Sequence, residues 1–450
     1  MIINIHVNNN FNSSNKKNNI LKFIDLYAGL GGFHLALEEL GHDCVFASEI
    51  NKNLRDLYKI NFPNSNIHGD ILKVDVINDI PKHDILCGGF PCQPFSRAGK
   101  QLGFEDEQKG NHFFKIIEIL KYHQTEFILL ENVETILKHD NGNTFKTITS
   151  LLENLEYEID FKINSPHEFN IPHHRRRLFI VGRKKNKSRK NSLEHFTWPE
   201  KKDINLTSIE TIFFDRDDDE NLQISSKHKN VFNIWNEFVK NFPNPSDLPG
   251  HPIWAHEFGA TYEYETKTPY ATPINELKEK LGVFGKQIIG NNKNEILLNS
   301  IPRYAAYPEN VFPRWKINYI RKNREFYNKY KGYLDEFKLK LEGLEFSNQK
   351  FEWSCKGEKN NLDDKIIQFR QSGLRVSKSN WFPALTTVKT QNIYLPKLDR
   401  KMSIKEAAQL QSMQKLKKIP DHTNGGYKAF GNAVNVEVVK LIAKNLLNGK

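Results

Sequence analysis

Short apolar runs alternate with amphipathic segments along the first part of the chain. Runs of strand length lie at residues 21–27, 44–48, 83–87, 127–130, 158–163 and 178–181. Segments with a helical spacing of apolar residues lie between them, at residues 33–40, 111–122 and 144–155. Strands that alternate with helices in this way form βαβ units, so the pattern predicts an α/β fold with a doubly wound sheet.

The turn after the first predicted strand is rich in glycine. It reads Ala28-Gly29-Leu30-Gly31-Gly32, and the amphipathic helix that follows closes at Gly41. Glycines in such a turn let the backbone approach a ligand closely and let the helix pack on the sheet. The spacing differs from the dinucleotide motif GxGxxG, so we do not predict pyrophosphate binding. A tight turn that binds no ligand is the alternative.

Acidic residues close the next two units at the same edge of the predicted sheet. Glu49 ends the second strand, and Asp70 follows Gly69 at the end of a short third unit. A carboxylate at the end of the second strand can hold the two hydroxyls of a ribose. Asp70 could accept a hydrogen bond from an adenine amino group. Either acid alone would be an ordinary loop residue, but with the glycine turn they favour an adenosine-containing cofactor.

A cysteine between two prolines follows the fourth predicted strand. The segment from Gly88 to Ser96 reads GGFPCQPFS, with Cys92 at its centre. Proline restricts the backbone on both sides of this thiol, and glycines at 99, 103 and 110 provide hinges in the loop beyond it. The pattern fits a nucleophile that is fixed at a strand end and then covered by a loop. The alternative is a small buried cysteine in a strand-to-loop turn.

Glu131 follows the apolar run at residues 127–130, within the sequence Glu131-Asn132-Val133. A carboxylate at the end of such a strand is costly unless it is paired or used. Partial burial would let it donate a proton near neutral pH. The alternative is a carboxylate that caps the N-terminus of a helix.

Three arginines precede the last apolar run. Arg175 and Arg177 flank Arg176, so in an extended chain they share one face. A solvated basic turn or a phosphate contact is the alternative. The adjacent pair His173-His174 has no cysteine or acidic partner at the spacing of zinc ligands, so we expect no metal here.

The net charge of the chain predicts that its partner is a polyanion. The 450 residues carry a formal net charge of +11, which favours nucleic acid or an anionic membrane. No apolar run is long enough to span a membrane and no signal-peptide pattern is present, so we expect a cytoplasmic protein whose four cysteines are free. The Asn-rich stretch at residues 1–20 predicts a disordered tail.

Five segments resemble the DNA (cytosine-5) methyltransferases of bacterial restriction–modification systems. They are DLYAGLGGF (25–33), GFPCQPFS (89–96), ENV (131–133), RRR (175–177) and FGNAVNVEVV (430–439). The resemblance covers residues 21–182 and 370–446, and GFPCQPFS with a downstream ENV is highly specific. One departure is His173, where the family usually has glutamine.

The resemblance implies a Rossmann-like, S-adenosylmethionine-dependent methyltransferase domain with a second, smaller target-recognition domain. The catalytic and cofactor-binding domain would take residues 21–182 and be completed by a C-terminal helix at 426–450. Target recognition would take residues 183–425. Within it, apolar residues at near-heptad spacing predict one long helix at 314–344 that packs through this stripe. The Lys and Arg residues around the stripe are the expected DNA contacts.

The resemblance also implies which molecules bind and which residues hold them. S-adenosyl-L-methionine would be the methyl donor and S-adenosyl-L-homocysteine the product, with no metal. The residues expected to bind the cofactor are Tyr27, Gly29, Leu30, Gly31, Gly32, Glu49, Ile50, Asp70, Ile71, Pro91, Asn432 and Ala433. The expected catalytic residues are Cys92, Glu131, Arg175 and Arg177, and the expected DNA-binding residues are Ser96, Arg97, Lys100 and Gln101.

In the reaction that the resemblance implies, the thiolate of Cys92 adds to C6 of a cytosine and makes C5 nucleophilic. Glu131 would donate or share a proton at N3. Arg177 would stabilise the O2 side of the ring directly, with Arg175 in support. The target base would first be flipped out of the duplex.

The expected partner is double-stranded DNA, bound by a monomer at the nucleoid, with no membrane. Methylation would protect DNA in a restriction–modification system whose endonuclease acts separately. Two alternatives stay open, namely the same chemistry on tRNA and a non-catalytic DNA-binding paralogue. A nicotinamide dehydrogenase is disfavoured by the absent GxGxxG and by the Pro-Cys-Gln-Pro loop.

Overall fold

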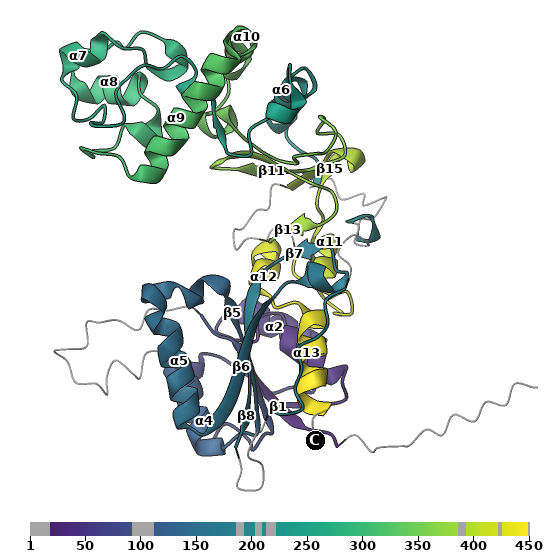
Figure 1. Ribbon diagram of the computed structural model, residues 1–450. Coiled ribbons are helices and arrows are strands. Elements are labelled where there is room, and N and C mark those ends of the chain that lie inside the picture. The colour runs from purple at the N-terminus through teal and green to yellow at the C-terminus, as the bar shows by residue number, and fades with distance from the viewer. Residues whose placement is uncertain are drawn as a thin grey trace, which may run out of the picture. The chain divides into compact units, whose positions relative to one another are not determined.

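The computed structural model describes residues 19–91, 112–185, 193–202, 209–212, 222–385, 393–421 and 425–448. The chain divides into two compact units (Figure 1). Unit 1 comprises Met1–Ile163, Arg177–Pro199 and Val436–Lys450, and unit 2 comprises Asn164–Arg176 and Glu200–Asn435. The predicted nucleophile Cys92, the predicted DNA-binding residues at 96–101 and the predicted tail up to residue 18 lie outside the described residues.

Unit 1 is built on a seven-stranded sheet with the order β3-β2-β1-β4-β5-β8-β6. Its strands are β1 (Lys22–Leu26), β2 (Asp43–Ser48), β3 (Ile67–His68), β4 (Ile85–Gly89), β5 (Phe127–Val133), β6 (Tyr157–Asn164) and β8 (Arg177–Lys184). The pairings from β3 through β5 are parallel, while β5 and β8 are antiparallel. The strand order reverses between β1 and β4, which confirms the predicted doubly wound α/β fold.

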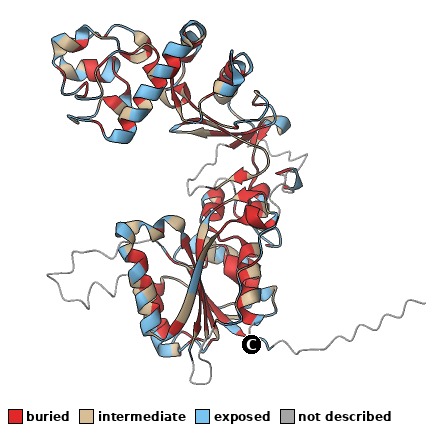
Figure 2. Ribbon diagram, in the orientation of Figure 1, coloured by how far each residue is buried: buried red, intermediate tan, exposed pale blue. Residues whose placement is uncertain are grey.

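Helices cover both faces of this sheet (Figure 1). They are α1 (Gly32–Glu38), α2 (Lys52–Asn61), α4 (His112–His123), α5 (Asn143–Asn154) and α13 (Val436–Asn448). Ile24, Leu86 and Ile128 on the central strands are fully buried between the two helical layers, and the core follows the sheet in Figure 2. Strands buried on both faces carry continuous apolar runs, as observed in the sequence.

The helix α13 completes unit 1. It packs against α1, and Lys440 of α13 forms a 2.7 Å ion pair with Glu39 at the end of α1. Asn445 donates a 2.8 Å hydrogen bond to the carbonyl oxygen of Thr197. The last helix therefore belongs to the same unit as the first strand. The segment predicted to complete this unit, 426–450, also contains α12 (Gly426–Asn432), which belongs to unit 2.

Unit 2 contains a six-stranded sheet with the order β15-β14-β11-β12-β10-β9 and a separate pair of β7 with β13. Its strands are β7 (His173–His174), β9 (Ile253–Trp254), β10 (Lys350–Ser354), β11 (Ile366–Arg370), β12 (Gly373–Ser377), β13 (Phe382–Pro383), β14 (Ile393–Leu395) and β15 (Arg400–Lys401). Its helices are α6 (Ser226–Lys240), α7 (Ile274–Lys278), α8 (Lys293–Asn299), α9 (Arg314–Lys329), α10 (Lys331–Leu341), α11 (Ile404–Leu410) and α12.

Two apolar clusters stabilise unit 2. One surrounds Trp235 and Phe238 of α6 and includes the central strands of the six-stranded sheet. The other surrounds Tyr262, Ile296 and Ile320, in the stretch of chain from β9 to α9. With this second cluster, unit 2 takes a larger share of the chain than unit 1. The prediction that the second domain is the smaller one is therefore wrong.

The single helix predicted at 314–344 is two helices in the structure. α9 and α10 meet at Tyr330, whose backbone leaves helical geometry with φ −118° and ψ 27°. The Tyr330 ring packs on Phe242 at 4.7 Å, and its hydroxyl donates a hydrogen bond to Asp247. Gly332 further lowers helix propensity at this point. The predicted packing stripe is confirmed from Phe326 onward by the burial of Phe326, Leu334, Phe337 and Leu341, whereas its first member, Trp315, is 56% exposed.

Candidate active site

The reversal of strand order between β1 and β4 marks the candidate site in unit 1. In doubly wound sheets, ligands bind outside the carboxyl ends of the strands at this switch point. Tyr27, Glu49, Asp70 and Pro91 come just after the ends of β1, β2, β3 and β4. The sheet therefore brings four of the predicted cofactor residues to one edge.

The glycine turn after β1 bends the chain through left-handed backbone conformations. Gly29 and Gly31 have φ values of 54° and 84°. A Cβ atom on Gly31 would lie 2.4 Å from Cε2 of Phe62, so only glycine fits there. Leu30 and Gly32 are buried in the same turn. The turn thus leads directly into α1 and exposes little side chain at the site.

The carboxylate of Glu49 joins the ends of β1 and β2. Its Oε2 accepts a 2.9 Å hydrogen bond from the N–H of Gly29, and its Oε1 accepts one of 2.8 Å from Asn51. Arg55 holds the backbone that follows, because its Nη1 donates to the carbonyl oxygens of Glu49 and Ile50. A carboxylate has about four lone-pair positions, so roughly half of them remain for ligand hydroxyls. Ile50 is 69% exposed and offers an apolar surface beside them.

Asp70 and Tyr27 lie close enough to interact electrostatically. Asp70 caps a short 3-10 helix (Ile71–Lys73), and its Oδ1 accepts a 3.1 Å hydrogen bond from the N–H of Leu72. The Tyr27 hydroxyl donates a 2.9 Å hydrogen bond to the carbonyl oxygen of His112. Burial, reinforced by the Asp70 charge, raises the pKa of Tyr27 well above its ordinary value, so the hydroxyl stays protonated. Ile71 is buried, which leaves only its backbone for a ligand.

A buried polar cluster beneath the turn is missing from the sequence-based predictions. Tyr58 Oη lies 3.5 Å from Oδ2 of Asp25 in β1 and 2.6 Å from Nδ1 of His34 in α1. Burial raises the pKa of Asp25 and lowers the pKa of His34 to about 3, so the histidine is neutral. The cluster ties β1 to α1 and α2. The sequence signal that could have predicted this cluster is Asp25, an acidic residue inside an apolar strand, where a carboxyl group needs a polar partner.

Glu131 lies within β5, one residue before Asn132, and faces groups from two other strands. Its Oε1 is 3.1 Å from Nε of Arg177 at the start of β8, and both side chains are largely buried. On the other side it pairs in register with Gly89 of β4, where a Cβ atom would come within 3.3 Å of Oε2. Asn132 donates a 2.9 Å hydrogen bond to the carbonyl oxygen of Phe90. The three strands thus fix a carboxylate–guanidinium pair next to the segment that leads to the predicted nucleophile.

Arg175 has a different environment from Arg177. β8 begins at Arg177, so Arg175 precedes the strand and belongs to unit 2. Its buried guanidinium donates to the carbonyl oxygens of Gly431 and Ala433, at 2.8 and 2.9 Å, on either side of Asn432. The two arginines therefore have different partners, Glu131 for Arg177 and backbone carbonyl oxygens for Arg175, and their sharing of one face stays a prediction. Arg175 instead organises the segment that holds two of the predicted cofactor residues.

His173 is fully buried in unit 2. Its Nδ1 lies 3.1 Å from the carbonyl oxygen of Leu410, and its Nε2 lies 3.4 Å from the N–H of Leu385. The first contact requires a donor and the second an acceptor, so Nδ1 carries the proton. A glutamine amide offers the same two groups. The departure from the family pattern therefore keeps the local hydrogen bonding.

Three cysteines lie in the described part of the chain, and all three are free thiols. Burial raises the pKa of Cys44 and Cys355 to about 12 and also raises the pKa of Cys87, so none of them is activated. Among the same residues, no cluster of His, Cys, Asp or Glu could hold a metal ion. No described helix is long and apolar enough to cross a bilayer.

Comparison with known proteins identifies the family. The profile of the C-5 cytosine-specific DNA methylases matches residues 21–448. The chain belongs to this family. The Type II methyltransferase M.DsaV of Dactylococcopsis salina is 44% identical over 207 residues, which are 46% of this chain and 57% of that protein. The Type II methyltransferase M.HhaI of Haemophilus parahaemolyticus is 43% identical over 161 residues, 36% of this chain and 48% of that protein.

The chain spans about half the length of the curated methyltransferases it matches. Among solved structures, the S. pombe Dnmt2 methyltransferase aligns over 95% of this chain and 98% of that chain, with a TM-score of 0.48 and 17% identity. The family assignment confirms the resemblance drawn from the five motifs. The family profile matches residues 21–448, so the family assignment includes unit 2 as well as unit 1.

Proposed function

We propose that the protein is a DNA (cytosine-5) methyltransferase that transfers a methyl group from S-adenosyl-L-methionine to C5 of a flipped-out cytosine in duplex DNA. The Glu131–Arg177 pair carries this proposal, because three strands hold it at 3.1 Å beside the segment that leads to Cys92. Membership of the C-5 cytosine-specific DNA methylase family supports the same reaction class.

The edge of the unit 1 sheet fits the cofactor. The left-handed turn at Gly29 and Gly31 lets a ligand approach the backbone. Among the described residues, only backbone N–H groups engage the two carboxylates, which leaves acceptor positions on Glu49 for ribose hydroxyls and one oxygen of Asp70 for an adenine amino group. When bound there, S-adenosyl-L-methionine supplies an electrophilic methyl group, and its product is S-adenosyl-L-homocysteine.

Cys92 is the proposed nucleophile, because burial keeps the other three cysteines protonated. Its thiolate forms a bond to C6 of cytosine, and the displaced electron pair makes C5 nucleophilic. C5 then takes the methyl group. Loss of the C5 proton returns an electron pair that breaks the bond between sulfur and C6, and Cys92 is regenerated as a thiolate.

Glu131 and Arg177 would act on the charge that thiolate addition places on the ring. Glu131 would hydrogen-bond at N3, and Arg177 would stabilise O2. Arg177 also orients the carboxylate through the 3.1 Å contact. Arg175 would be a positioning residue, because backbone carbonyl oxygens engage its guanidinium.

We further propose that unit 2 recognises the DNA target. The relatives are named Type II methyltransferases. The proposed role is therefore protection of DNA in a restriction–modification system whose endonuclease acts separately.

The deciding experiment is expression in a methylation-free bacterial host, followed by single-base mapping of 5-methylcytosine across the host DNA. The proposal requires one short motif to be methylated at nearly every occurrence. An unmodified genome, with expression and folding verified, would reject DNA as the acceptor. Incubation with tRNA would then separate a tRNA methyltransferase from a non-catalytic paralogue.

A further inference from the structure

A histidine at the cofactor edge of unit 1 is not among the residues predicted to bind the cofactor. His112 is the first residue of α4, a helix that packs against the 3-10 helix capped by Asp70. The Tyr27 hydroxyl donates a 2.9 Å hydrogen bond to the carbonyl oxygen of His112. The two rings meet edge to face, with their centroids 5.3 Å apart. His112 therefore lies beside Tyr27, where β1 ends and the proposed site begins.

The charge of Asp70 acts on His112 as it does on Tyr27. Burial has the larger effect on the histidine and lowers its pKa, although the Asp70 charge opposes this shift. The His112 ring is therefore neutral near pH 7 and has one N–H donor and one acceptor. His112 and Asp70 thus border the same part of the site, one as a neutral ring and the other as a carboxylate.

The two ring nitrogens of His112 have different surroundings. Nδ1 is buried and makes no hydrogen bond to a described residue. Nε2 makes none either, yet described residues do not bury it. A buried N–H without a partner is rarer than a buried acceptor without one, so the proton belongs on Nε2. The accessible nitrogen of His112 is thus a donor that no described residue uses.

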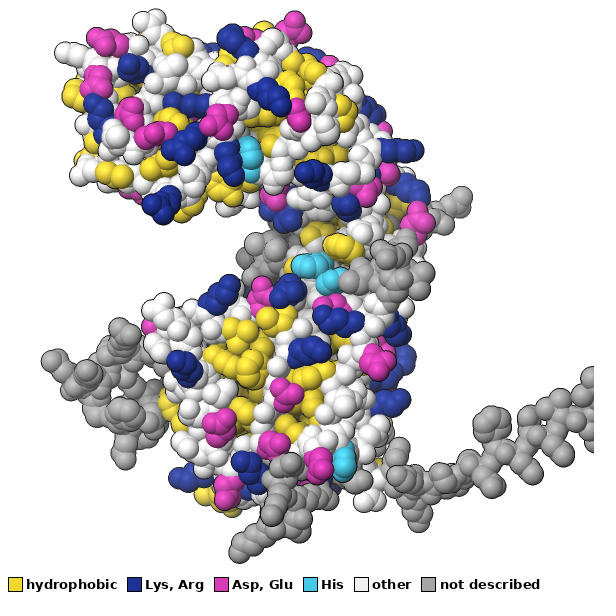
Figure 3. All heavy atoms as spheres, viewed as in Figure 1, with side chains coloured by type: hydrophobic (Ala, Val, Ile, Leu, Met, Phe, Trp, Pro, Cys, Tyr) yellow, Lys and Arg dark blue, Asp and Glu magenta, His cyan; other side chains and the backbone are white. Residues whose placement is uncertain are grey.

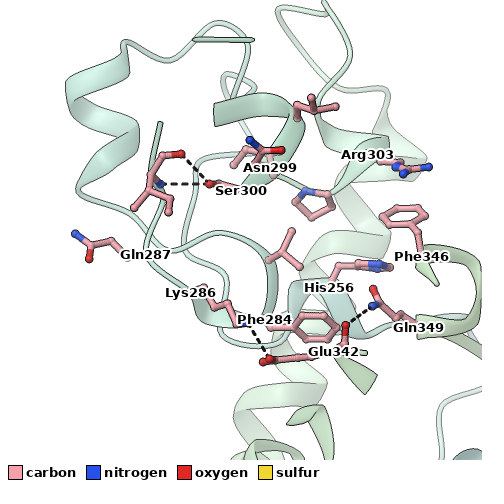
Figure 4. Close-up of a pocket in the computed structure, with 15 residues that line it drawn as sticks. His256, Phe284, Lys286, Gln287, Asn299, Ser300, Arg303, Glu342, Phe346 and Gln349 are labelled. Atoms are coloured by element: carbon pink, nitrogen blue, oxygen red, sulfur yellow. Dashed lines mark hydrogen bonds and ion pairs between the residues drawn. The ribbon is translucent and has the colours of Figure 1, made fainter. Parts of the chain in front are cut away.

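His256 of unit 2 shows how an unavailable histidine differs from this one. It lines a pocket of about 390 Å³ (Figure 4), but the residue is only 1% exposed. Its ring packs on Phe346 with the centroids 4.1 Å apart, and the Gln349 side chain is a hydrogen-bond partner of the ring. The cations Arg303 and Lys350 also face the Phe346 ring, at 5.4 and 4.5 Å. The described groups around this pocket therefore engage one another.

Surface charge indicates no competing site on the face drawn in Figure 3, where Lys and Arg side chains of described residues are interspersed with Asp and Glu. In unit 2, for example, Lys329 pairs with Asp247 and Lys340 pairs with Glu237. The unused donor of His112 is therefore the stronger indication of a contact to a ligand.

We propose that His112 is a cofactor-binding residue whose Nε2–H donates a hydrogen bond to a ring nitrogen of the adenine. Among the described residues only the N–H of Leu72 engages Asp70, so one carboxylate oxygen serves the adenine amino group. A donor beside an acceptor matches the ring nitrogen and the amino group that adenine presents side by side. The proposal rests on the function proposed above and deepens it, because it names a contact to the adenosine of S-adenosyl-L-methionine.

The first test is calorimetric titration of the full-length protein with S-adenosyl-L-homocysteine, which binds without reacting. His112→Leu keeps an apolar side chain but removes the donor, so it should weaken binding by about threefold to tenfold. His112→Gln retains an N–H donor and should bind more tightly than His112→Leu. His123→Leu is the matched control and should bind normally, because His123 ends the same helix and its Nε2 already contacts the carbonyl oxygen of Val76 at 2.9 Å.

The second test uses analogues of S-adenosyl-L-homocysteine in which carbon replaces N1, N3 or N7 of the adenine. At least one analogue should bind the unaltered protein about threefold to tenfold more weakly than S-adenosyl-L-homocysteine. The same two ligands should bind His112→Leu equally, because the donor that distinguished them is gone. A merely structural role of His112 would instead weaken all of the ligands alike in the variant and preserve the difference between them.

Thermal melting of each variant checks folding, and His112→Ala replaces His112→Leu if the leucine variant is unstable. Equal affinities of the variant and the unaltered protein would overturn the role of His112 and leave the proposed function standing. An analogue penalty that persists in the variant would do the same. Failure of S-adenosyl-L-homocysteine to bind the unaltered protein would reject both the role and the proposed function.

Discussion

The candidate active site of unit 1 and the cations Arg303 and Lys350 of unit 2 differ in the partners of their charged groups. In unit 1, Glu49 accepts two backbone hydrogen bonds and Glu131 contacts Arg177. In unit 2, Arg303 and Lys350 face aromatic rings and have no carboxylate partner among the described residues. The first arrangement is preorganised, so a bound reactant meets groups that already hold their positions. In the second, attraction between a cation and an aromatic ring takes the place of an ion pair.

Among the variants of the two units, removal of the proposed nucleophile should lower the rate of methyl transfer most. Cys92→Ala is expected to lower methyl transfer by about 10⁴-fold or more, because no other thiol can form the bond to C6. Cofactor affinity should stay within about twofold, because preorganisation of the sheet edge does not depend on the thiol. Transfer of labelled methyl groups and calorimetry measure the two quantities. Cys44→Ala is the control and should retain activity, whereas comparable turnover by Cys92→Ala would refute the thiolate mechanism.

The carboxylate of unit 1 is the next target. Glu131→Gln should slow single-turnover methylation by about 10²–10³-fold, because proton sharing at N3 is lost. Cofactor affinity should not change.

Glu126→Gln is the matched control for this variant. Glu126 pairs with Arg183 at 2.7 Å across the same two strands, at the opposite end of the sheet. The Glu126→Gln variant should methylate DNA at the same single-turnover rate as the unaltered protein. Equal slowing in both variants would mean that the Glu131–Arg177 contact is structural.

The glycine turn allows the cofactor edge to be perturbed without touching a charge. Gly31→Ala should reduce the free energy of unfolding by about 2–4 kcal/mol, since it combines a strained φ with a steric clash. Cofactor affinity should fall by about tenfold or more as the turn shifts. Urea unfolding and calorimetry give both values.

Comparison of Gly41→Ala with Gly31→Ala separates the cost of backbone strain from the cost of the steric clash. Its φ is 85°, close to the 84° of Gly31, but a Cβ atom there meets nothing within 4 Å. It should cost about 1 kcal/mol and leave cofactor binding intact. Equal losses in the two variants would show that the contact with Phe62 is unimportant.

The smallest expected effect concerns His173 in unit 2. His173→Gln should change the free energy of unfolding by less than about 1 kcal/mol, because the amide supplies the same donor and acceptor. His173→Leu should cost about 1–3 kcal/mol, because the N–H of Leu385 and the carbonyl of Leu410 lose their partner. Denaturant unfolding tests both, and indistinguishable variants would show that the two contacts contribute nothing.

The edge of unit 1 could be predicted because its signals are local. Strand ends, a glycine turn and acids that follow apolar runs all lie within short segments, and Glu49, Asp70 and Glu131 lie at the predicted edge. The boundary of β5 was less predictable, since Glu131 and Asn132 lie inside the strand, where β8 pairs with them. That pairing joins segments far apart in sequence.

Unit 2 was harder to predict because its packing is long-range. Arg175 donates to Gly431, which is 256 positions further along the chain, and no local pattern specifies such a partner. The break at Tyr330 depends on Asp247 and Phe242, again distant in sequence. Periodicity identified the stripe on α9 and α10 correctly, but only tertiary contacts determine where one helix ends and the next begins.

The return of α13 to α1 has a consequence for synthesis of the protein. Unit 1 begins with β1 but receives its last helix only after all of unit 2 has been translated. At about 5–20 residues per second, the ribosome takes roughly 10–50 s to produce the intervening segment. During that time the nascent chain presents the apolar surface that α13 later covers, so chaperone binding is expected there. A prematurely terminated chain would retain the proposed nucleophile and yet lack a completed cofactor unit.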